Sequence, residues 1–408
     1  MIKICKVVCF LLVFALLFTW MDNRFYNHES AWDATDDWSG QQFDIVFMGD
    51  SHIFCSVNPV MINDALGINT VVLGSSAQPM KVTYYNLKTL LSKTLPGAIV
   101  IGENMLASSV DQIYVEGKIG FLYGSLDGIR SPVQRADAVL NIIPYDHWLE
   151  AYSQMFRPSD TWKRLSNWNS GFKPYGVLGY QPRERITEDS VDIQAIENQY
   201  RDTAGTRQNQ DPVDLTYMRK ILDLAQKKGI PVYIISCPMS SFRVKNSNIM
   251  YDLNQLAKEY SVVRAVQDYN LELSDIGLTR EDYYDSGHLN SLGAAKFTEY
   301  LIRDIGKWIG READFSRIGW LRGEHVEALS DGLYRYTVDL YGGCRIRFTA
   351  RDGSKKVIAS TKYSHTNFID LPALGKDCSL SYELKAERAD SFTHTYPQKL
   401  NFILRPAG

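Results

Sequence analysis

The sequence lacks the features that mark several large classes of protein. Its 408 residues contain no cluster of lysine and arginine, and a net charge of −3 gives no electrostatic footprint for nucleic acid. Among its six cysteines no pair has the spacing of a zinc site. There is no internal repeat and no low-complexity tract. We therefore expect no nucleic-acid partner, no metal and no cofactor.

Long hydrophobic runs are also scarce, and the one that is present lies at the N-terminus. Lys3 and Lys6 precede an unbroken apolar run from Val7 to Met21, which spans about 22 Å at 1.5 Å per residue. No small-x-small cleavage site follows it. We predict an uncleaved signal anchor over 1–24 that leaves the rest of the chain exported, followed by a polar stalk over 25–42. A cleaved signal peptide is the alternative.

Between residues 43 and 310 the pattern alternates between strands and helices. This alternation predicts an α/β fold with a parallel sheet and helices on both faces. The expected strands are 43–49, 68–74, 97–104, 230–239 and 261–269, and the expected helices are 59–66, 82–95, 215–229, 250–260 and 291–309. Sites in such sheets lie at the carboxyl ends of strands. The first three strands end in GDSH, GSSA and GEN, so we expect a functional site there.

One long stretch, from about 106 to 212, interrupts this alternation. It is too long for a plain loop, and we predict an insertion with some helices over the edge of the sheet. Trp168 and Tyr175 lie among its polar and glycine residues. We interpret the insertion either as a wall of the substrate site, with these two side chains as contacts, or as a segment that only adds packing to the fold.

The pattern changes again in the C-terminal region, 318–408. Apolar and polar residues alternate between glycine and aspartate turns, which predicts a small antiparallel β-sandwich. Cys344 and Cys378 both lie in this region. If it is exported, they can form a disulfide, and the sequence leaves a bonded and a free pair equally open.

Two distant stretches carry the residue types of nucleophilic catalysis. Ser51 follows the first strand in FMGDSH, and Gly49 permits a tight turn there. Asp285 and His288 are three residues apart in DSGHLN, just before the last helix. A serine hydroxyl needs a base to take its proton, and a histidine base needs a third group to orient it. We predict that these three side chains meet across the strand ends.

These two motifs resemble the first and last blocks of the SGNH/GDSL hydrolase family. The resemblance covers about 43–310, roughly two thirds of the chain, and implies a flavodoxin-like sheet. It makes Ser51 the nucleophile, His288 the base and Asp285 the orienting carboxylate. Neither motif is specific alone, but GDS on a first strand with DxxHLN before a last helix is a specific combination.

The family's middle blocks match this chain less closely. The resemblance implies an oxyanion hole built from the amide of Ser51, a backbone amide after the second strand and an asparagine after the third. The glycine expected after the second strand falls on Ala77, with Gly74 three residues earlier. Asn104 stands in the expected Gly-x-Asn position, but Met105 replaces the aspartate that follows it. A plain turn asparagine is the alternative for Asn104.

The pattern also resembles exported SGNH-like proteins that work with membrane-bound O-acyltransferases to acylate cell-surface glycans. This resemblance implies a polysaccharide substrate, such an acyltransferase as partner, a carbohydrate-binding role for the C-terminal domain and a single-pass location in a bacterial cell membrane, with the catalytic domain outside. Gln78, near the expected site, is predicted to contact substrate. His52 is predicted to have either a structural role or a substrate contact, and it is left out of the triad.

Several other functions remain open at this point. A serine acyl-enzyme can transfer its acyl group to a sugar or to water, so an esterase that only deacetylates glycans is an alternative. A non-catalytic glycan-binding partner of an acyltransferase is another. A metallophosphoesterase would use Asp285 and His288 as ligands, but its further ligand motifs are absent from the sequence.

Overall fold

The computed structural model describes residues 2–25, 42–107, 109–129, 131–157, 177–209, 213–342, 344–375, 377–386 and 398–403. At its centre lies a five-stranded parallel sheet in the order β2-β1-β3-β4-β5. This is the strand order of flavodoxin-like doubly wound sheets. The strands are β1 (Ile45–Gly49), β2 (Thr70–Gly74), β3 (Ala98–Gly102), β4 (Val232–Ser236) and β5 (Val263–Asp268). The predicted α/β class and parallel sheet are therefore confirmed.

Helices cover both faces of this sheet because its inner strands are apolar on both sides. Every residue of β1 to β4 is buried, as continuous apolar strands between two helical layers must be. One face packs on α2 (Ser51–Ser56), α3 (Pro59–Leu66) and α14 (Ser291–Ile309). The other packs on α4 (Met80–Leu91), α11 (Thr216–Lys228) and α12 (Val244–Ala257).

The described part of the insertion divides between the two sides of the molecule. Four helices form one apolar cluster with the outer side of α4, and two of them contact that helix directly. They are α5 (Val110–Val115), α6 (Ile119–Leu126), α7 (Pro132–Ile142) and α8 (Trp148–Tyr152). After residue 177 the chain runs beside α2 and the start of α14. It then forms α10 (Ile193–Thr203), which packs near the short α13 (Leu273–Ile276).

The C-terminal region forms two antiparallel sheets, as its alternating pattern predicts. One has the order β10-β7-β6 and the other β12-β11-β8-β9. Tyr336 and Tyr382, one from each sheet, both pack on Phe402. The strands are β6 (Leu321–Ala328), β7 (Leu333–Leu340), β8 (Cys344–Arg351), β9 (Val357–Ser360), β10 (Phe368–Pro372), β11 (Ser379–Ala386) and β12 (Gln398–Asn401).

These sheets share their buried core with the α14 side of the central sheet. Trp320, just before β6, is buried against Tyr180 with ring centroids 6.1 Å apart. The backbone amide of Gly319 donates a hydrogen bond of 3.0 Å to Asp64 on α3. The two regions are therefore joined by apolar and polar contacts.

Cys344 and Cys378 are not joined by a disulfide in this structure. The antiparallel ladder explains why. Cys344 pairs with Ala386 at one end of β8, whereas Cys378 precedes the first residue of β11, which pairs with Arg351 at the other end. Eight strand residues separate these ends, a distance of about 25 Å. That is far beyond the reach of a disulfide.

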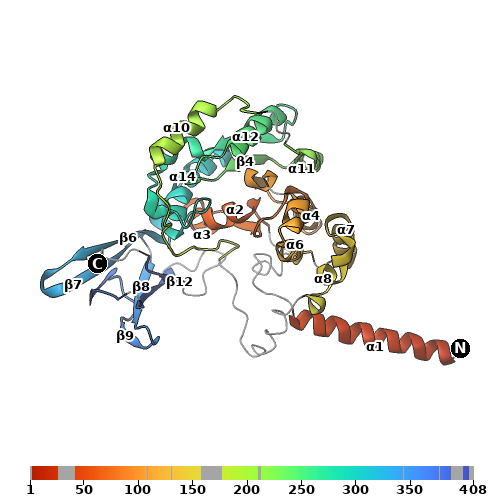
Figure 1. The fold of residues 1–408 in the computed structure, drawn as a ribbon, viewed down its shortest axis with the longest axis horizontal. Helices are drawn as coiled ribbons and strands as arrows, with labels where there is room; N and C mark the ends of the chain where they lie inside the picture. Colours follow the sequence, from red (N-terminus) through yellow and green to blue (C-terminus); the bar gives the residue numbers. More distant parts are fainter. Residues whose placement is uncertain are drawn as a thin grey trace.

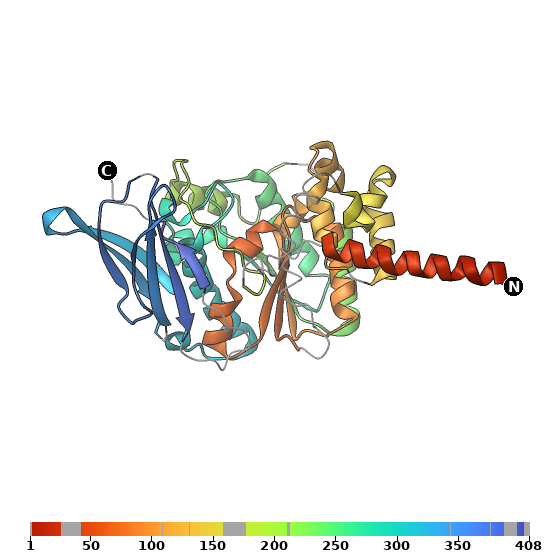
Figure 2. The same cartoon turned by 90° about the horizontal axis from the view of Figure 1, so that it is seen from below.

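The N-terminal run forms α1 (Ile2–Phe25), which projects from the end of the molecule opposite the C-terminal sheets (Figures 1 and 2). The stretch Cys5–Asp22 is long and apolar enough to cross a membrane. Length and composition are the only grounds for this assignment, and a signal sequence meets the same criteria. Most of the predicted stalk, 25–42, falls outside the described residues.

Candidate active site

Ser51 is the first residue of α2, directly after the end of β1. The side chain of Asp50 caps this helix by accepting a hydrogen bond of 3.0 Å from the backbone amide of His52. The chain therefore passes from strand to helix with Ser51 at the junction. The sequence predicted only a tight turn here, because the following residues, IFCSV, carry no strong helix signal.

Three glycines at the ends of neighbouring strands let α2 approach the sheet. A Cβ atom on Gly49 or Gly102 would lie 2.3 or 2.5 Å from the Cγ1 atom of Ile53, and one on Gly74 would lie 2.6 Å from the Gly49 carbonyl oxygen. Gly49 is not in the left-handed region, so its role is to make room for Ile53 and not to permit an unusual turn. This close approach sets the position of Ser51.

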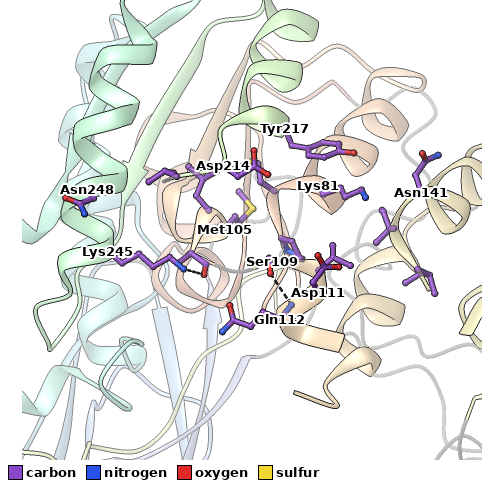
Figure 3. Close-up of a pocket in the computed structure, with 18 of the residues that line it drawn as sticks. Lys81, Met105, Ser109, Asp111, Gln112, Asn141, Asp214, Tyr217, Lys245 and Asn248 are labelled. Carbon is purple, nitrogen blue, oxygen red and sulfur yellow. Dashed lines mark hydrogen bonds between the residues drawn. The ribbon is translucent and has the colours of Figure 1, made fainter. Parts of the chain in front are cut away.

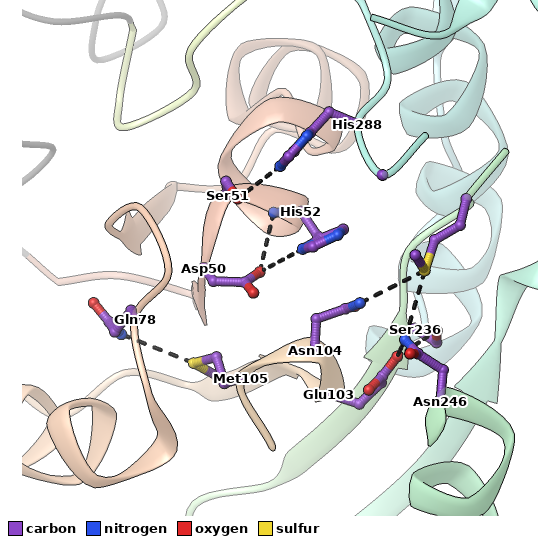
Figure 4. A network of polar contacts seen from close by, with 12 residues as sticks. Asp50, Ser51, His52, Gln78, Glu103, Asn104, Met105, Ser236, Asn246 and His288 are labelled. Carbon is purple, nitrogen blue, oxygen red and sulfur yellow. Dashed lines mark hydrogen bonds and ion pairs between the residues drawn. The ribbon is translucent and has the colours of Figure 1, made fainter. Parts of the chain in front are cut away.

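His288 and Asp285 are brought to Ser51 from the loop before α14. The Nε2 atom of His288 lies 2.7 Å from the Oγ atom of Ser51 (Figure 4). The Nδ1 atom of His288 lies 2.8 Å from Oδ1 of Asp285. These distances are those of hydrogen bonds. The three side chains form the linked row that the two sequence motifs predicted.

The surroundings of Asp285 favour its charged form. Burial opposes the charge, but hydrogen bonds from the His288 ring and from the Gly287 and His288 amides lower the pKa of Asp285 to about 2. The loop is held from behind by Ser240 and Ser241. Their hydroxyls donate to the carbonyl oxygens of residues 285 and 286. A carboxylate so placed fixes the orientation of the His288 ring.

A second histidine–aspartate pair lies beneath the first. The His52 ring stacks on the His288 ring, with centroids 4.8 Å apart and planes 24° apart. Its Nδ1 atom lies 3.1 Å from Oδ1 of Asp50. Burial opposes both charges, yet mutual attraction raises the pKa of His52 and lowers that of Asp50. The ring of His52 therefore limits the rotation of His288, which is a structural role.

The predicted oxyanion donors come from the start of α2, the chain after β2 and the turn after β3. Among the described residues, the backbone amides of Ser51 and Ala77 donate no hydrogen bond, and Ala77 has a positive φ of 50°. The Asn104 amide group is buried, and its nitrogen contacts only the sulfur of Met239, at 3.7 Å. Gly74 differs from these donors in its position, because it is the last residue of strand β2 and lies in register with Gly49 of β1.

A buried carboxyl group next to Asn104 was not predicted from the sequence. Glu103 accepts hydrogen bonds of 2.9 Å from Ser236 and from Asn246. Burial raises the pKa of Glu103 to about 8. Asn270 extends the network by donating to Ser236 and accepting from the amide of Met239. The sequence does contain a signal for this buried carboxyl group, namely an acidic residue at the end of the apolar strand AIVIGEN.

The remaining predicted substrate contacts are Gln78, Trp168 and Tyr175. Gln78 is fully buried, and its side-chain amide binds Thr83 at 2.8 Å and Asn86 at 3.3 Å. It holds the loop after β2 to α4, and its side chain is enclosed by protein. Trp168 and Tyr175 lie outside the described residues.

A large cavity lies away from the sheet face that α2 covers, and Ser51, Asp285 and His288 are not among its lining residues. It has a volume of about 990 Å³ and is bounded by the start of α4, the chain after β3, the end of α7 and the start of α12 (Figure 3). Met105 forms part of its wall, one residue after Asn104. Its lining mixes amides and charges, among them Lys81, Asp111, Asn141 and Asp214.

Taken together, the groups fit nucleophilic acyl transfer. A hydroxyl, a base and a carboxylate are linked by hydrogen bonds in one row. Within the ranges that the structure describes, no group of three or more His, Cys, Asp and Glu side chains is arranged to hold a metal ion.

Comparisons with known proteins provide no family assignment. No protein-family model and no curated protein matches the chain. Among solved structures, an engineered protein is 9% identical, with 92% of this chain and 97% of that chain covered, at a TM-score of 0.17. An endo-beta-1,4-mannanase double mutant from Cellulomonas fimi is 9% identical over the same shares, at a TM-score of 0.15. At these scores neither similarity carries an argument about this chain.

Proposed function

We propose that this chain is an SGNH-type serine O-acyltransferase or esterase that acts on O-acyl groups of a polysaccharide. One observation carries the proposal: Ser51, His288 and Asp285 are linked by contacts of 2.7 and 2.8 Å at the carboxyl end of a parallel sheet. The GDSH and DSGHLN motifs that supply these residues support the same family.

In the first step the Oγ atom of Ser51 attacks the acyl carbon of the donor. The Nε2 atom of His288 accepts the hydroxyl proton, and Asp285 stabilises the imidazolium that forms. The negative charge on the former carbonyl oxygen is held by the amides of Ser51 and Ala77 and by the side chain of Asn104. His288 then gives the proton to the departing oxygen, which leaves an acyl group on Ser51.

In the second step an acceptor hydroxyl attacks this acyl group. His288 takes the acceptor's proton and returns it to Ser51, while the acyl group passes to the acceptor oxygen. A sugar hydroxyl as acceptor gives O-acylation, and water gives deacylation. An esterase that only deacetylates glycans uses the same residues and is the alternative.

The proposed location is the outer side of a bacterial cell membrane, with α1 as a single-pass anchor. The apolar stretch Cys5–Asp22 supports this location. A membrane-bound O-acyltransferase is the proposed partner that supplies the acyl group, and the C-terminal sheets are the proposed glycan-binding part. A non-catalytic glycan-binding role for the whole chain is the competing hypothesis.

The test is a search for the acyl-enzyme. Full-length protein would be incubated with p-nitrophenyl acetate and measured by intact-mass spectrometry, with Ser51→Ala beside it. Ser56→Ala is a matched control, because Ser56 is a serine of the same helix whose side chain is buried away from solvent. We expect a mass gain of one acetyl group in the wild type and in Ser56→Ala but not in Ser51→Ala.

Adding acceptors separates the two activities. Faster loss of the acetyl group with oligosaccharide than with buffer indicates a transferase, and loss to water alone favours an esterase. An adduct that persists in a folded Ser51→Ala protein contradicts the assigned nucleophile. No adduct and no hydrolysis under any condition favours the non-catalytic role.

A further inference from the structure

The segment from Tyr145 to Phe156 carries an apolar stripe that faces outward. Trp148, Leu149 and Tyr152 share one side of α8, while Tyr145 lies in the short turn before it and Phe156 in the short turn after it. In a soluble protein such a stripe normally faces the core. Here all five side chains are exposed, with Tyr145 at 81% and Leu149 at 66%. We call these five residues the α8 patch.

The opposite side of the same segment is the buried one. Ala151, Ser153 and Gln154 are buried against the protein body. Among the described residues beyond α1, most exposed large apolar side chains lie between Tyr114 and Phe156. The apolar surface is therefore concentrated on the insertion helices and is not spread over the molecule.

The α8 patch is joined directly to the end of α1. Asp22 accepts a hydrogen bond of 2.6 Å from the Ser153 hydroxyl and one of 3.1 Å from the Met155 amide. The rings of Phe18 and Phe156 lie 6.1 Å apart. Figures 1 and 2 show α1 leaving the body beside α8, in the direction away from the C-terminal sheets.

These contacts fix the depth of the patch relative to the candidate membrane span. Asp22 is the last residue of the apolar stretch Cys5–Asp22, and Phe18 lies four residues inside it. At 1.5 Å per residue, Phe18 is about 6 Å below the end of the span. Interfacial helices bury their apolar face by about 5–10 Å. Phe156, beside Phe18, therefore lies at interfacial depth.

We infer that the α8 patch rests in the lipid interface of the membrane that α1 crosses, so that the body is docked on the bilayer as well as anchored to it. This inference rests on the membrane location proposed above. Tyrosine and tryptophan are the residues enriched at this level of a bilayer. Asp146 and Glu150 border the patch, so zwitterionic lipid, and not an anionic surface, is the fitting occupant.

The experiment measures quenching of a fluorophore by lipids in nanodiscs that hold the full-length protein. Cys5, Cys9 and Cys378 would be replaced by serine, which leaves only buried cysteines. A dye would then be attached to Leu149→Cys or to Ile358→Cys. Ile358 is a matched control because it is 51% exposed but lies on β9, in the C-terminal sheets. A dye at Leu12→Cys reports on α1 itself.

Nanodiscs of phosphatidylcholine with a spin label near the glycerol level supply the quencher. We expect at least twofold quenching at positions 12 and 149, little at 358, and no effect of added salt. Quenching at 12 but not at 149 overturns the docking and leaves the anchor in place, whereas quenching at neither overturns both. If the dye at position 149 is shielded from solvent in native membranes but not in lipid nanodiscs, the α8 patch is covered by a membrane protein. The assignment to lipid is then wrong.

Discussion

The position of Ser51 depends on the absence of a side chain at Gly102, which makes Gly102→Ala the sharpest test of how the site is built. The added methyl carbon would lie 2.5 Å from Cγ1 and 2.9 Å from Cδ1 of Ile53. Carbon atoms normally rest about 3.5–4.0 Å apart, so α2 must move outward by about 1 Å. Overpacking of this kind costs about 1–3 kcal/mol of the free energy of unfolding.

The same displacement acts on the reacting atoms. Ser51 begins α2, and its Oγ atom is 2.7 Å from Nε2 of His288. An added ångström breaks this hydrogen bond, and misplacement on that scale costs about 10²-fold in rate. The assay is the rate of acetyl-enzyme formation from p-nitrophenyl acetate, with urea unfolding measured on the same samples.

A double-mutant cycle ties both effects to the contact with Ile53. Ile53→Ala alone leaves a cavity that costs about 2–5 kcal/mol, but in the double variant the new methyl occupies part of that space. The combined loss should therefore be smaller than the sum of the single losses. Gly120→Ala on α6, where a Cβ atom meets nothing within 4 Å, is the control with no expected loss. Additive losses, or an unchanged rate in Gly102→Ala, would refute the reasoning.

Three further predictions follow from the electrostatics and the cysteines. Burial raises the pKa of Glu103 to about 8 from its ordinary 4.5, so the folded protein holds an extra proton between these values. The free energy of unfolding should therefore fall as the pH rises from about 5 to 8. In urea unfolding, Glu103→Gln should show a weaker dependence of this free energy on pH. The pKa of Asp285 is lowered to about 2, so its stabilising contribution is present above pH 3.8 and is lost as the pH falls toward 2. Asp285→Asn should slow acetylation by about 10⁴-fold with the fold retained by circular dichroism, and an unchanged rate would exclude it as the orienting group. Because Cys344 and Cys378 are at opposite ends of their ladder, dithiothreitol should leave the melting temperature unchanged, and a drop would indicate a disulfide.

Much of the central fold could be predicted because its signals are local. Strands such as IVFMG are apolar throughout, and α14 begins at a capping Asn290 and ends at Gly310 in the left-handed conformation. The meeting of Ser51 with Asp285 and His288 follows from the parallel sheet, which collects the ends of distant strands on one edge. These parts needed only periodicity, caps and topology.

The remaining features depend on contacts that no local pattern contains. The stacking of His52 on His288 and the burial of Glu103 arise from elements far apart in the sequence. Gln78 has the composition of a surface loop residue, yet Thr83 and Asn86 enclose its side-chain amide. Polar residues of this kind are assigned to a core or to a substrate surface only by the tertiary structure around them.

The shared core between α14 and the C-terminal sheets limits how the chain can be divided. Cutting the chain after residue 310 would remove Trp320, which packs on Tyr180. It would also expose the apolar side of α14, the helix that follows the His288 loop. A fragment without the sheets would therefore lose cooperativity in the part that positions His288. We expect the intact chain from residue 43 onward to melt in a single calorimetric transition, so its C-terminal region cannot be exchanged like a detachable module.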